Sequence, residues 1–223
     1  SIIAKYPHLA DIDVAKLRIG TLHGLCNDLM QEFRAVNYQN VRLMDDFEQG
    51  MFIHQHLSAV RNDDPADLAH WRHFHYLFRR NEWQAGYANL PSKWLRSVAF
   101  QKLFNRIVED RCDVASMHAT GGAWDWLAGL YEEYAQHLTT YFRCDFSHLQ
   151  QRFIEFLGTS LGQEFLTGEA TPDYNGIEWV LVDEYQDTNL AQEAIYMTLG
   201  NRTPYNLVVV GDDDQAMYRF RGG

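Results

Sequence analysis

The sequence Val180-Leu-Val-Asp-Glu-Tyr-Gln-Asp-Thr-Asn189 decides the fold of this chain. Three apolar residues precede an acidic pair, Asp183 and Glu184, and a polar turn then leads into a helix-like segment. A short, fully apolar run is typical of a strand buried on both faces of a parallel sheet. Asp183 and Glu184 are therefore expected at the carboxyl end of that strand, where open α/β sheets bind their ligands.

The same pattern recurs downstream. Leu207–Val210 is apolar and is followed by Gly211-Asp-Asp-Asp-Gln215. Two buried strands that each end in carboxylates, with a helix between them, form one βαβ unit with carboxylates along one edge of its sheet. Such an acidic edge favours binding of a hard cation such as Mg²⁺, held by one or two carboxylates beside the phosphates of a nucleotide. The two stretches together predict an α/β fold with a nucleotide site.

The amino-acid composition limits the classes of protein to which this chain can belong. With 223 residues, of which 46% are hydrophobic and 14% aromatic, the chain can bury a substantial core. No apolar run approaches the ~18 residues of a membrane span, and no signal-peptide pattern is present at the N-terminus. Cys26, Cys112 and Cys144 lack metal-binding spacing and are typical of free thiols in a reducing compartment. We therefore expect a cytoplasmic protein with no membrane partner.

The net charge of −11 argues against a surface coated in basic residues. Non-specific affinity for nucleic acid comes mainly from lysine and arginine neutralising phosphates, so an acidic chain binds weakly through that effect. A local groove that stacks bases on aromatic side chains is still compatible with this charge. Composition alone therefore disfavours nucleic acid, and only specific motifs can overturn it.

The N-terminal part is expected to belong to the sheet domain. Lys16–Thr21 alternates like a short strand with Leu17 and Ile19 on one face. A helix follows, with Thr21 and His23 at the junction between strand and helix. The apolar stripe of that helix consists of Leu22, Leu25, Cys26, Leu29, Phe33 and Val36.

The middle of the chain has a different character. From about Asp45 to Gly168, candidate helices follow one another without a convincing strand. Their helical spacing is longest in the segment that contains Trp124, Tyr131 and Tyr134, which are expected to face an interior. The helix that begins near Phe146 has a possible capping box formed by Ser147 and Gln150.

The return to the sheet follows a turn-rich linker at Gly168–Gly176. Ile177–Val182 then enters the sheet, and Leu190–Leu199 forms a helix that begins after good N-capping residues. These patterns predict a division into residues 1–40, a helical insertion over 41–170, and residues 171–223, which complete the first part.

Four features of the sequence also have plainer interpretations. An Asp-Glu pair after apolar residues is often only a solvated turn, and Thr21 with His23 is often an N-cap followed by a surface histidine. Tyr218 and Phe220 are, on their own, more typical of core packing. Five histidines invite a metal interpretation, but they lack a complementary cysteine or carboxylate set, so solvated helix faces are favoured. These are His54, His56, His70, His73 and His75.

Several motifs in combination overturn the plainer interpretations. Asp183–Thr188 closely resembles the Walker B box of UvrD/Rep-like DNA helicases of superfamily one, and Gly211–Gly222 resembles their motif III. Thr21–Cys26 is similar to a DNA-contacting motif of the first motor domain, with Leu22 and Gly24 departing from the usual Phe and Ser. Asp145–Leu149 also resembles a family segment that precedes Walker B.

The resemblance implies a partial RecA-like P-loop NTPase sheet with an inserted all-helical subdomain, and ATP and Mg²⁺ as cofactors. It implies that Asp183 holds the metal, that Glu184 is the base or water-positioning group, and that Gln215 senses the γ-phosphate. These roles suit phosphoryl transfer, which depends on positioning and charge neutralisation. All three residues then belong to the ATP site.

The resemblance also implies DNA contacts. Thr21 and His23 are implied to touch the backbone of single-stranded DNA. Tyr218 and Phe220 are implied to stack on bases, with Arg221 on phosphates. The expected partners are single-stranded DNA, junctions of single- and double-stranded DNA, and the remaining helicase domains of the parent chain.

No Gly-x-x-x-x-Gly-Lys-Ser/Thr loop occurs in the sequence. The family carries that loop upstream of Walker B, so we expect it before Ser1, and the remaining arginines of the ATP site beyond Gly223. We therefore expect a fragment of an ATP-dependent 3′-to-5′ DNA helicase that is inactive alone. Two alternatives stay open: a non-catalytic interaction or regulatory remnant of this fold, and the motor part of a helicase–nuclease of the AddA/RecB kind.

Overall fold

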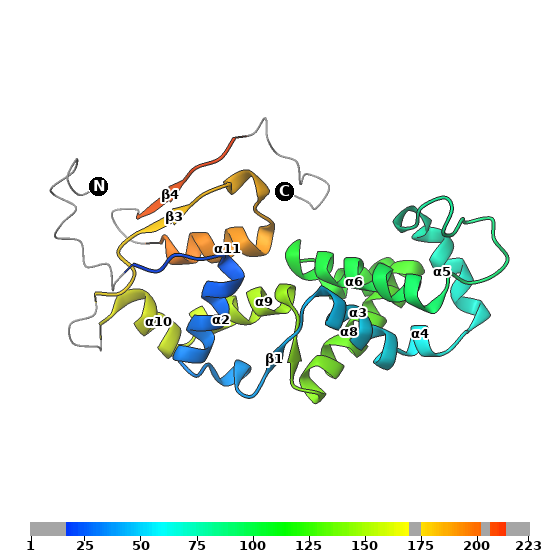
Figure 1. Ribbon diagram of the computed structural model, residues 1–223, viewed down its shortest axis with the longest axis horizontal. Coiled ribbons are helices and arrows are strands. Elements are labelled where there is room, and N and C mark those ends of the chain that lie inside the picture. Colours follow the sequence, from blue (N-terminus) through cyan, green and yellow to red (C-terminus); the bar gives the residue numbers. More distant parts are fainter. Residues whose placement is uncertain (1–16, 170–174, 202–205, 213–223) are drawn as a thin grey trace.

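The computed structural model describes residues 17–169, 175–201 and 206–212. This part of the chain is mostly helical, with two small parallel sheets (Figure 1). The elements up to residue 77 are α2 (Leu22–Glu32), η3 (Val36–Tyr38), β1 (Arg42–Leu43), α3 (Asp46–His56), α4 (Ser58–Arg61), η4 (Pro65–Asp67), α5 (Leu68–His73) and η5 (His75–Leu77). The elements that follow are α6 (Lys93–Glu109), α7 (Val114–Thr120), α8 (Ala123–Thr140), β2 (Arg143–Cys144), α9 (Phe146–Leu157), α10 (Ser160–Thr167), β3 (Val180–Val182), η6 (Tyr185–Asp187), α11 (Leu190–Leu199) and β4 (Leu207–Val209).

The two sheets lie at different places in the chain. In the first, β1 pairs in parallel with β2, so that Arg42 faces Arg143 and Leu43 faces Cys144. The chain therefore leaves after β1 and returns to the same point at β2, after the helices α3 to α8. In the second sheet, β3 pairs in parallel with β4, with α11 between them in sequence. This is the βαβ unit that the sequence predicts.

Two apolar cores fill the described part of the chain. The larger core is formed by helices α3 to α8, with Trp71, Phe100, Phe104 and Tyr134 at its centre. The smaller core joins α2, α9, α10 and α11. In Figure 1, α2, α10, α11 and the β3–β4 sheet lie on the left, α3, α4, α5, α6 and α8 lie on the right, and α9 lies between them.

The helix termini follow from local sequence. Asn189 and Gln192 form a reciprocal capping box at the start of α11, and Asp45 and Glu48 form another at the start of α3. The capping box predicted at Ser147 and Gln150 is wrong. The N-cap of α9 is Asp145, whose carboxylate accepts a hydrogen bond from the His148 backbone and also suits the positive end of the helix dipole.

Several other predictions need correction. Residues 17–21 do not form a strand, because they belong to neither of the two strand pairings among the described residues, and Ile19 is 84% exposed. Val36 is also exposed and does not continue the buried stripe of α2. The middle segment does contain one short strand, β2, which sequence reasoning missed because two residues are too few to show a period.

The strand at the Walker B-like stretch is present but is less buried than predicted. It begins at Val180 rather than Ile177, and Leu181 is 73% exposed. The reason is that α11 packs on this sheet, while the described residues place no helix over Leu181. Of the three aromatics predicted to face the helical interior, Tyr134 is buried, Tyr131 is partly buried, and Trp124 lies at the edge with its ring against Phe74.

Candidate nucleotide and DNA site

The carboxyl ends of β3 and β4 bring the two acidic turns together. Val182 faces Val209 in the parallel register, and the Val210 amide donates to the Val182 carbonyl at 2.8 Å. Beyond the strands, the Tyr185 amide donates to the Val210 carbonyl at 3.0 Å. Asp183 and Glu184 therefore lie beside the start of the second acidic turn, as the sequence predicts.

Glu184 has an unusual backbone. Its φ of 54° and ψ of 40° place it in the left-handed region, which is sparsely populated for residues other than glycine, asparagine and aspartate. Its amide donates to Oδ1 of Asp183 at 3.0 Å, and the chain then turns into η6. Asp183 and Glu184 are both exposed at the end of the sheet. Strain at such a position is common where a side chain must be held in one direction.

Gln186 joins the two acidic turns. Its Nε2 donates to Oε2 of Glu184 at 2.6 Å, and its Oε1 accepts a hydrogen bond from the backbone amide of Asp212 at 2.9 Å. The sequence analysis assigned no role to Gln186. In the sequence, Gln186 is marked only by its place in a turn two residues after Glu184. Its second contact is to the backbone amide of Asp212, and a backbone contact leaves no pattern in the sequence.

The exposed carboxylate of Asp183 is a ligand of the kind that Mg²⁺ uses beside the phosphates of a nucleotide. No group of three or more His, Cys, Asp or Glu side chains in the described residues could hold a metal by itself. A magnesium ion at Asp183 would take water and phosphate oxygens among its other ligands, which is the usual arrangement for this ion. The same finding leaves the histidine-rich stretch without a metal cluster among the residues described.

Thr21 is the N-cap of α2, and its hydroxyl accepts a hydrogen bond from the Gly24 amide at 3.2 Å. This is the plainer role considered for it. His23 lies in the first turn of the helix, partly buried, with its ring edge-on to Phe146 at a centroid distance of 5.2 Å. Its Nε2 lies 2.7 Å from the side-chain amide of Gln150, on α9. Burial lowers the pKa of His23, although the charge of Asp46 opposes that effect.

Helix α9 connects the two candidate sites. It packs against α2 on one side and α11 on another, and α11 packs on β3 and β4. The DNA-contact candidates on α2 and the acidic turns therefore belong to one continuous packed unit. Gln215, Tyr218, Phe220 and Arg221 lie outside the described residues.

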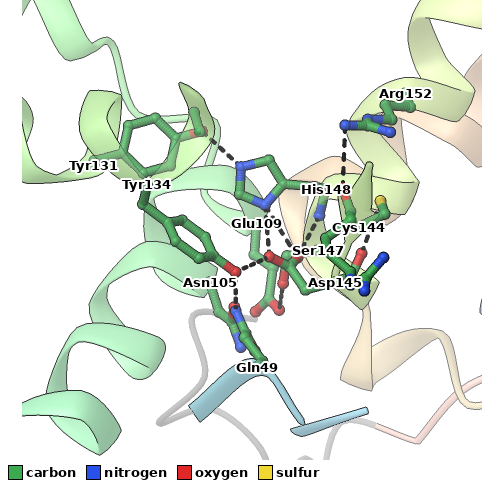
Figure 2. A network of polar contacts seen from close by, with 12 residues as sticks. Gln49, Asn105, Glu109, Tyr131, Tyr134, Cys144, Asp145, Ser147, His148 and Arg152 are labelled. Carbon is green, nitrogen blue, oxygen red and sulfur yellow. Dashed lines mark hydrogen bonds and ion pairs between the residues drawn. The ribbon is translucent and has the colours of Figure 1, made fainter. Parts of the chain in front are cut away.

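A buried polar network lies where α9 meets the helical insertion (Figure 2). Asp145, which is 1% exposed, accepts a hydrogen bond from the Tyr134 hydroxyl at 2.6 Å and one from Nδ1 of His148 at 2.9 Å. Gln49 donates to the Tyr134 hydroxyl and to Asn105. The network thus ties α3, α6 and α8 to the first turn of α9.

The protonation state of this network is set by its surroundings. Burial acts to raise the pKa of Asp145, but His148 and the hydrogen bonds from His148 and Tyr134 together hold it below its usual range. Burial, followed by the charge of Asp145, raises the pKa of Tyr134 well above its usual range. Asp145 is therefore a buried carboxylate whose charge is compensated on several sides.

A family model matches nearly the whole chain. The model described as "UvrD/REP helicase N-terminal domain" matches residues 3–223. None of the helices in the described part of the chain combines the length and the apolarity that crossing a membrane requires.

Curated relatives match over shorter stretches. The chain is 38% identical over 77 residues to an ATP-dependent helicase/nuclease subunit of Ligilactobacillus salivarius, a match covering 34% of this chain and 6% of that protein. It is 42% identical over 85 residues to the corresponding protein of Geobacillus kaustophilus, covering 34% and 7%. It is 51% identical over 49 residues to the ATP-dependent DNA helicase Rep of Escherichia coli, covering 22% and 7%. The matched stretches thus span only a small part of each relative.

Proposed function

This chain belongs to the family of UvrD/REP helicase N-terminal domains, and from that premise we propose that it is part of an ATP-dependent DNA helicase moving 3′ to 5′ on single strands. The observation that carries the proposal is the joined pair of acidic turns at the carboxyl ends of β3 and β4. Two adjacent parallel strands ending in carboxylates form the kind of edge at which phosphates and a metal are bound in open α/β sheets.

The residue roles are those that the family resemblance implies, and they suit phosphoryl-transfer chemistry. Asp183 holds Mg²⁺, mostly through water, and Glu184 orients the attacking water and accepts its proton. When bound, the metal neutralises charge that develops on the transferred phosphoryl group. Gln215 completes this side of the site as the group that senses the γ-phosphate. The 223 residues contain no Gly-x-x-x-x-Gly-Lys-Ser/Thr loop.

The DNA side of the proposal uses two segments. Thr21 and His23 contact the backbone of the strand at the N-terminal end of α2, where the helix dipole also favours phosphate. Tyr218 and Phe220 stack on bases, and Arg221 contacts phosphate. The partners are single-stranded DNA, junctions of single- and double-stranded DNA, and the remaining helicase domains.

The proposed architecture is a RecA-like sheet domain interrupted by a helical subdomain. The β1–β2 pair supports this layout, because it brings the two ends of the interruption side by side. The packing of α9 and α10 with α2 and α11 favours a subdomain that ends at β2 and not at the linker near residue 170. The proposed division is therefore 1–40, 41–170 and 171–223, except that the helical subdomain ends at β2.

A second candidate is the motor part of a helicase–nuclease. The observation that favours it is the similarity to relatives named as ATP-dependent helicase/nuclease subunits, over 34% of this chain. Both candidates use the same motor site and differ in whether the parent chain also cuts DNA.

The test is an unwinding assay with the complete protein. Duplexes with a 3′ tail, with a 5′ tail and with blunt ends are compared in the presence of ATP and Mg²⁺, and both strands are examined for cleavage. We expect unwinding of the 3′-tailed duplex, abolished by Glu184→Gln. Unwinding only from the 5′ tail contradicts the proposed direction, cleavage products select the helicase–nuclease, and neither activity selects a non-catalytic remnant.

A further inference from the structure

We propose that Gln186 is a positioning residue that holds the carboxylate of Glu184 against the turn after β4. The inference rests on the proposed function of Glu184 and deepens it, since it concerns how that side chain is held and which part of the chain reports to it. Gln186 belongs to η6, directly after the acidic pair, and is partly buried.

The orientation of the Gln186 amide is fixed by chemistry. The Asp212 backbone amide can only donate, so the atom that faces it at 2.9 Å must be the carbonyl oxygen of the side chain. That leaves the NH₂ group facing the Glu184 carboxylate at 2.6 Å, where a donor is required. A rotated amide would oppose donor to donor at one end and oxygen to carboxylate at the other. Both contacts therefore support one arrangement.

Close packing reinforces that arrangement. A Cβ added at Gly211 would lie 2.6 Å from Oε1 of Gln186, 3.2 Å from the Gln186 amide nitrogen and 3.3 Å from the Tyr185 amide nitrogen. The turn after β4 thus lies so close to Gln186 that only glycine fits at position 211 without a shift. A larger residue there could be accommodated only if the Gln186 amide moved.

The side chain of Gln186 therefore connects the turn after β3 directly to the turn after β4. Glu184 already has a left-handed backbone and lies at the edge of the sheet, so its side chain would otherwise sample several rotamers. The hydrogen bond from Gln186 favours one of these rotamers. Gln186 in turn accepts a hydrogen bond from the backbone amide of Asp212, which lies three residues before Gln215 in the sequence. A displacement of the Gly211–Asp212 turn, such as one that follows contact between Gln215 and a γ-phosphate, would move the Gln186 amide and with it the Glu184 carboxylate.

The test uses the complete helicase with Gln186→Met, which keeps the side-chain length and removes both hydrogen bonds. The matched control is Gln151→Met, because Gln151 also donates to a glutamate, Glu155, on the exposed face of α9. Phosphate release with single-stranded DNA present gives kcat and the KM for ATP. We expect kcat to fall about 10- to 100-fold in Gln186→Met with KM nearly unchanged, as for a misplaced reacting group, and no change in the control.

A double-mutant cycle separates positioning from general damage. If Gln186 acts through Glu184, Gln186→Met adds little to the loss already caused by Glu184→Gln. Losses that multiply overturn the inference, as does an unchanged kcat in Gln186→Met. If Glu184→Gln itself leaves hydrolysis intact, the proposed function fails instead, so the two failures are distinguishable.

Gln186→Glu provides a second variant for the case in which Gln186→Met folds poorly. It retains an oxygen for the Asp212 amide but sets a carboxylate against Glu184. Protonation of the introduced carboxyl restores a donor, so the ratio of variant to wild-type kcat should rise as pH falls from about 8 towards 5. A ratio independent of pH over that range contradicts positioning by a hydrogen bond to Glu184.

Discussion

The side-chain amide of Gln150 lies 2.7 Å from Nε2 of His23, although the two residues are 127 positions apart in the sequence. Gln150 is buried on α9, and His23 lies in the first turn of α2. With the amide nitrogen of Gln150 assigned to face the ring, Nε2 of His23 accepts the hydrogen bond, and a neutral ring then carries its proton on Nδ1. The bond fixes the direction of a side chain that we propose to contact DNA.

Gln150→Leu should weaken binding of single-stranded DNA by the complete helicase more than it destabilises the fold. The variant frees the His23 ring, which costs about 1 kcal/mol of binding, roughly a fivefold loss of affinity. Unfolding should change little, because Oε1 of Gln150 is buried without a hydrogen-bond partner in the described structure and its removal offsets the lost bond.

Fluorescence anisotropy with a labelled single strand measures this effect. Gln151→Leu, at the exposed neighbouring position on α9, is the control and should bind like wild type. Equal affinities for Gln150→Leu and wild type would show that the His23 orientation does not matter for DNA.

Asp145→Asn should destabilise the chain by about 1–3 kcal/mol, because one carboxylate oxygen that accepts from buried partners is replaced by an NH₂ group. Asparagine still caps α9, so the loss reports on the contacts with Tyr134 and His148 and not on the cap. The control is Asp113→Asn, which makes the same change at the exposed N-cap of α7 and should alter the free energy of unfolding far less.

The same variant has a defined pH dependence. The folded-state pKa of Asp145 is lowered, so its ionised form stabilises the fold above the unfolded pKa near ~3.9, and that stabilisation is lost as pH falls through the folded value. Urea unfolding at neutral and at low pH should therefore show the difference between wild type and Asp145→Asn shrinking in acid. A constant difference would mean that the charge of Asp145 is not what the network stabilises.

Sequence reasoning predicted the βαβ unit because two apolar runs ending in carboxylates carry a strong local signal. Helix α11 was predicted with the bounds that the structure shows, because its capping residues and Gly200 mark both ends. Asp183 and Glu184 were placed correctly at the end of β3 for the same reason.

What the sequence did not reveal depends on contacts between distant segments. The β1–β2 pair, the bond between Gln150 and His23, and the bridge from Gln186 to Asp212 join positions with no shared period. The capping box at Ser147 was wrong because Asp145, two residues earlier, offers a charged acceptor to the same helix. Local pattern identifies elements, but packing of α9 decides which side chains meet.

Phe220→Ala in the complete helicase should weaken single-strand binding by about 1–3 kcal/mol, the range for loss of one stacked base. Phe220 lies outside the described residues, so this prediction rests on the resemblance of Gly211–Gly222 to motif III of the helicase family. Unwinding should fall more than DNA-free ATP hydrolysis. The salt dependence of binding should barely change, because no phosphate contact is removed. Unaltered affinity and unwinding would indicate that the ring belongs to the core.

The central claim is that Glu184 acts in ATP hydrolysis, and the most direct measurement compares Glu184→Gln with wild type in the complete helicase. Nucleotide affinity is measured with Mg²⁺ and a slowly hydrolysed ATP analogue, and turnover by phosphate release on single-stranded DNA. Because the substitution keeps size and removes only the base, nucleotide affinity should stay within about threefold while kcat falls at least about 100-fold. An unchanged kcat, or a collapse of nucleotide affinity, would contradict the assignment of Glu184.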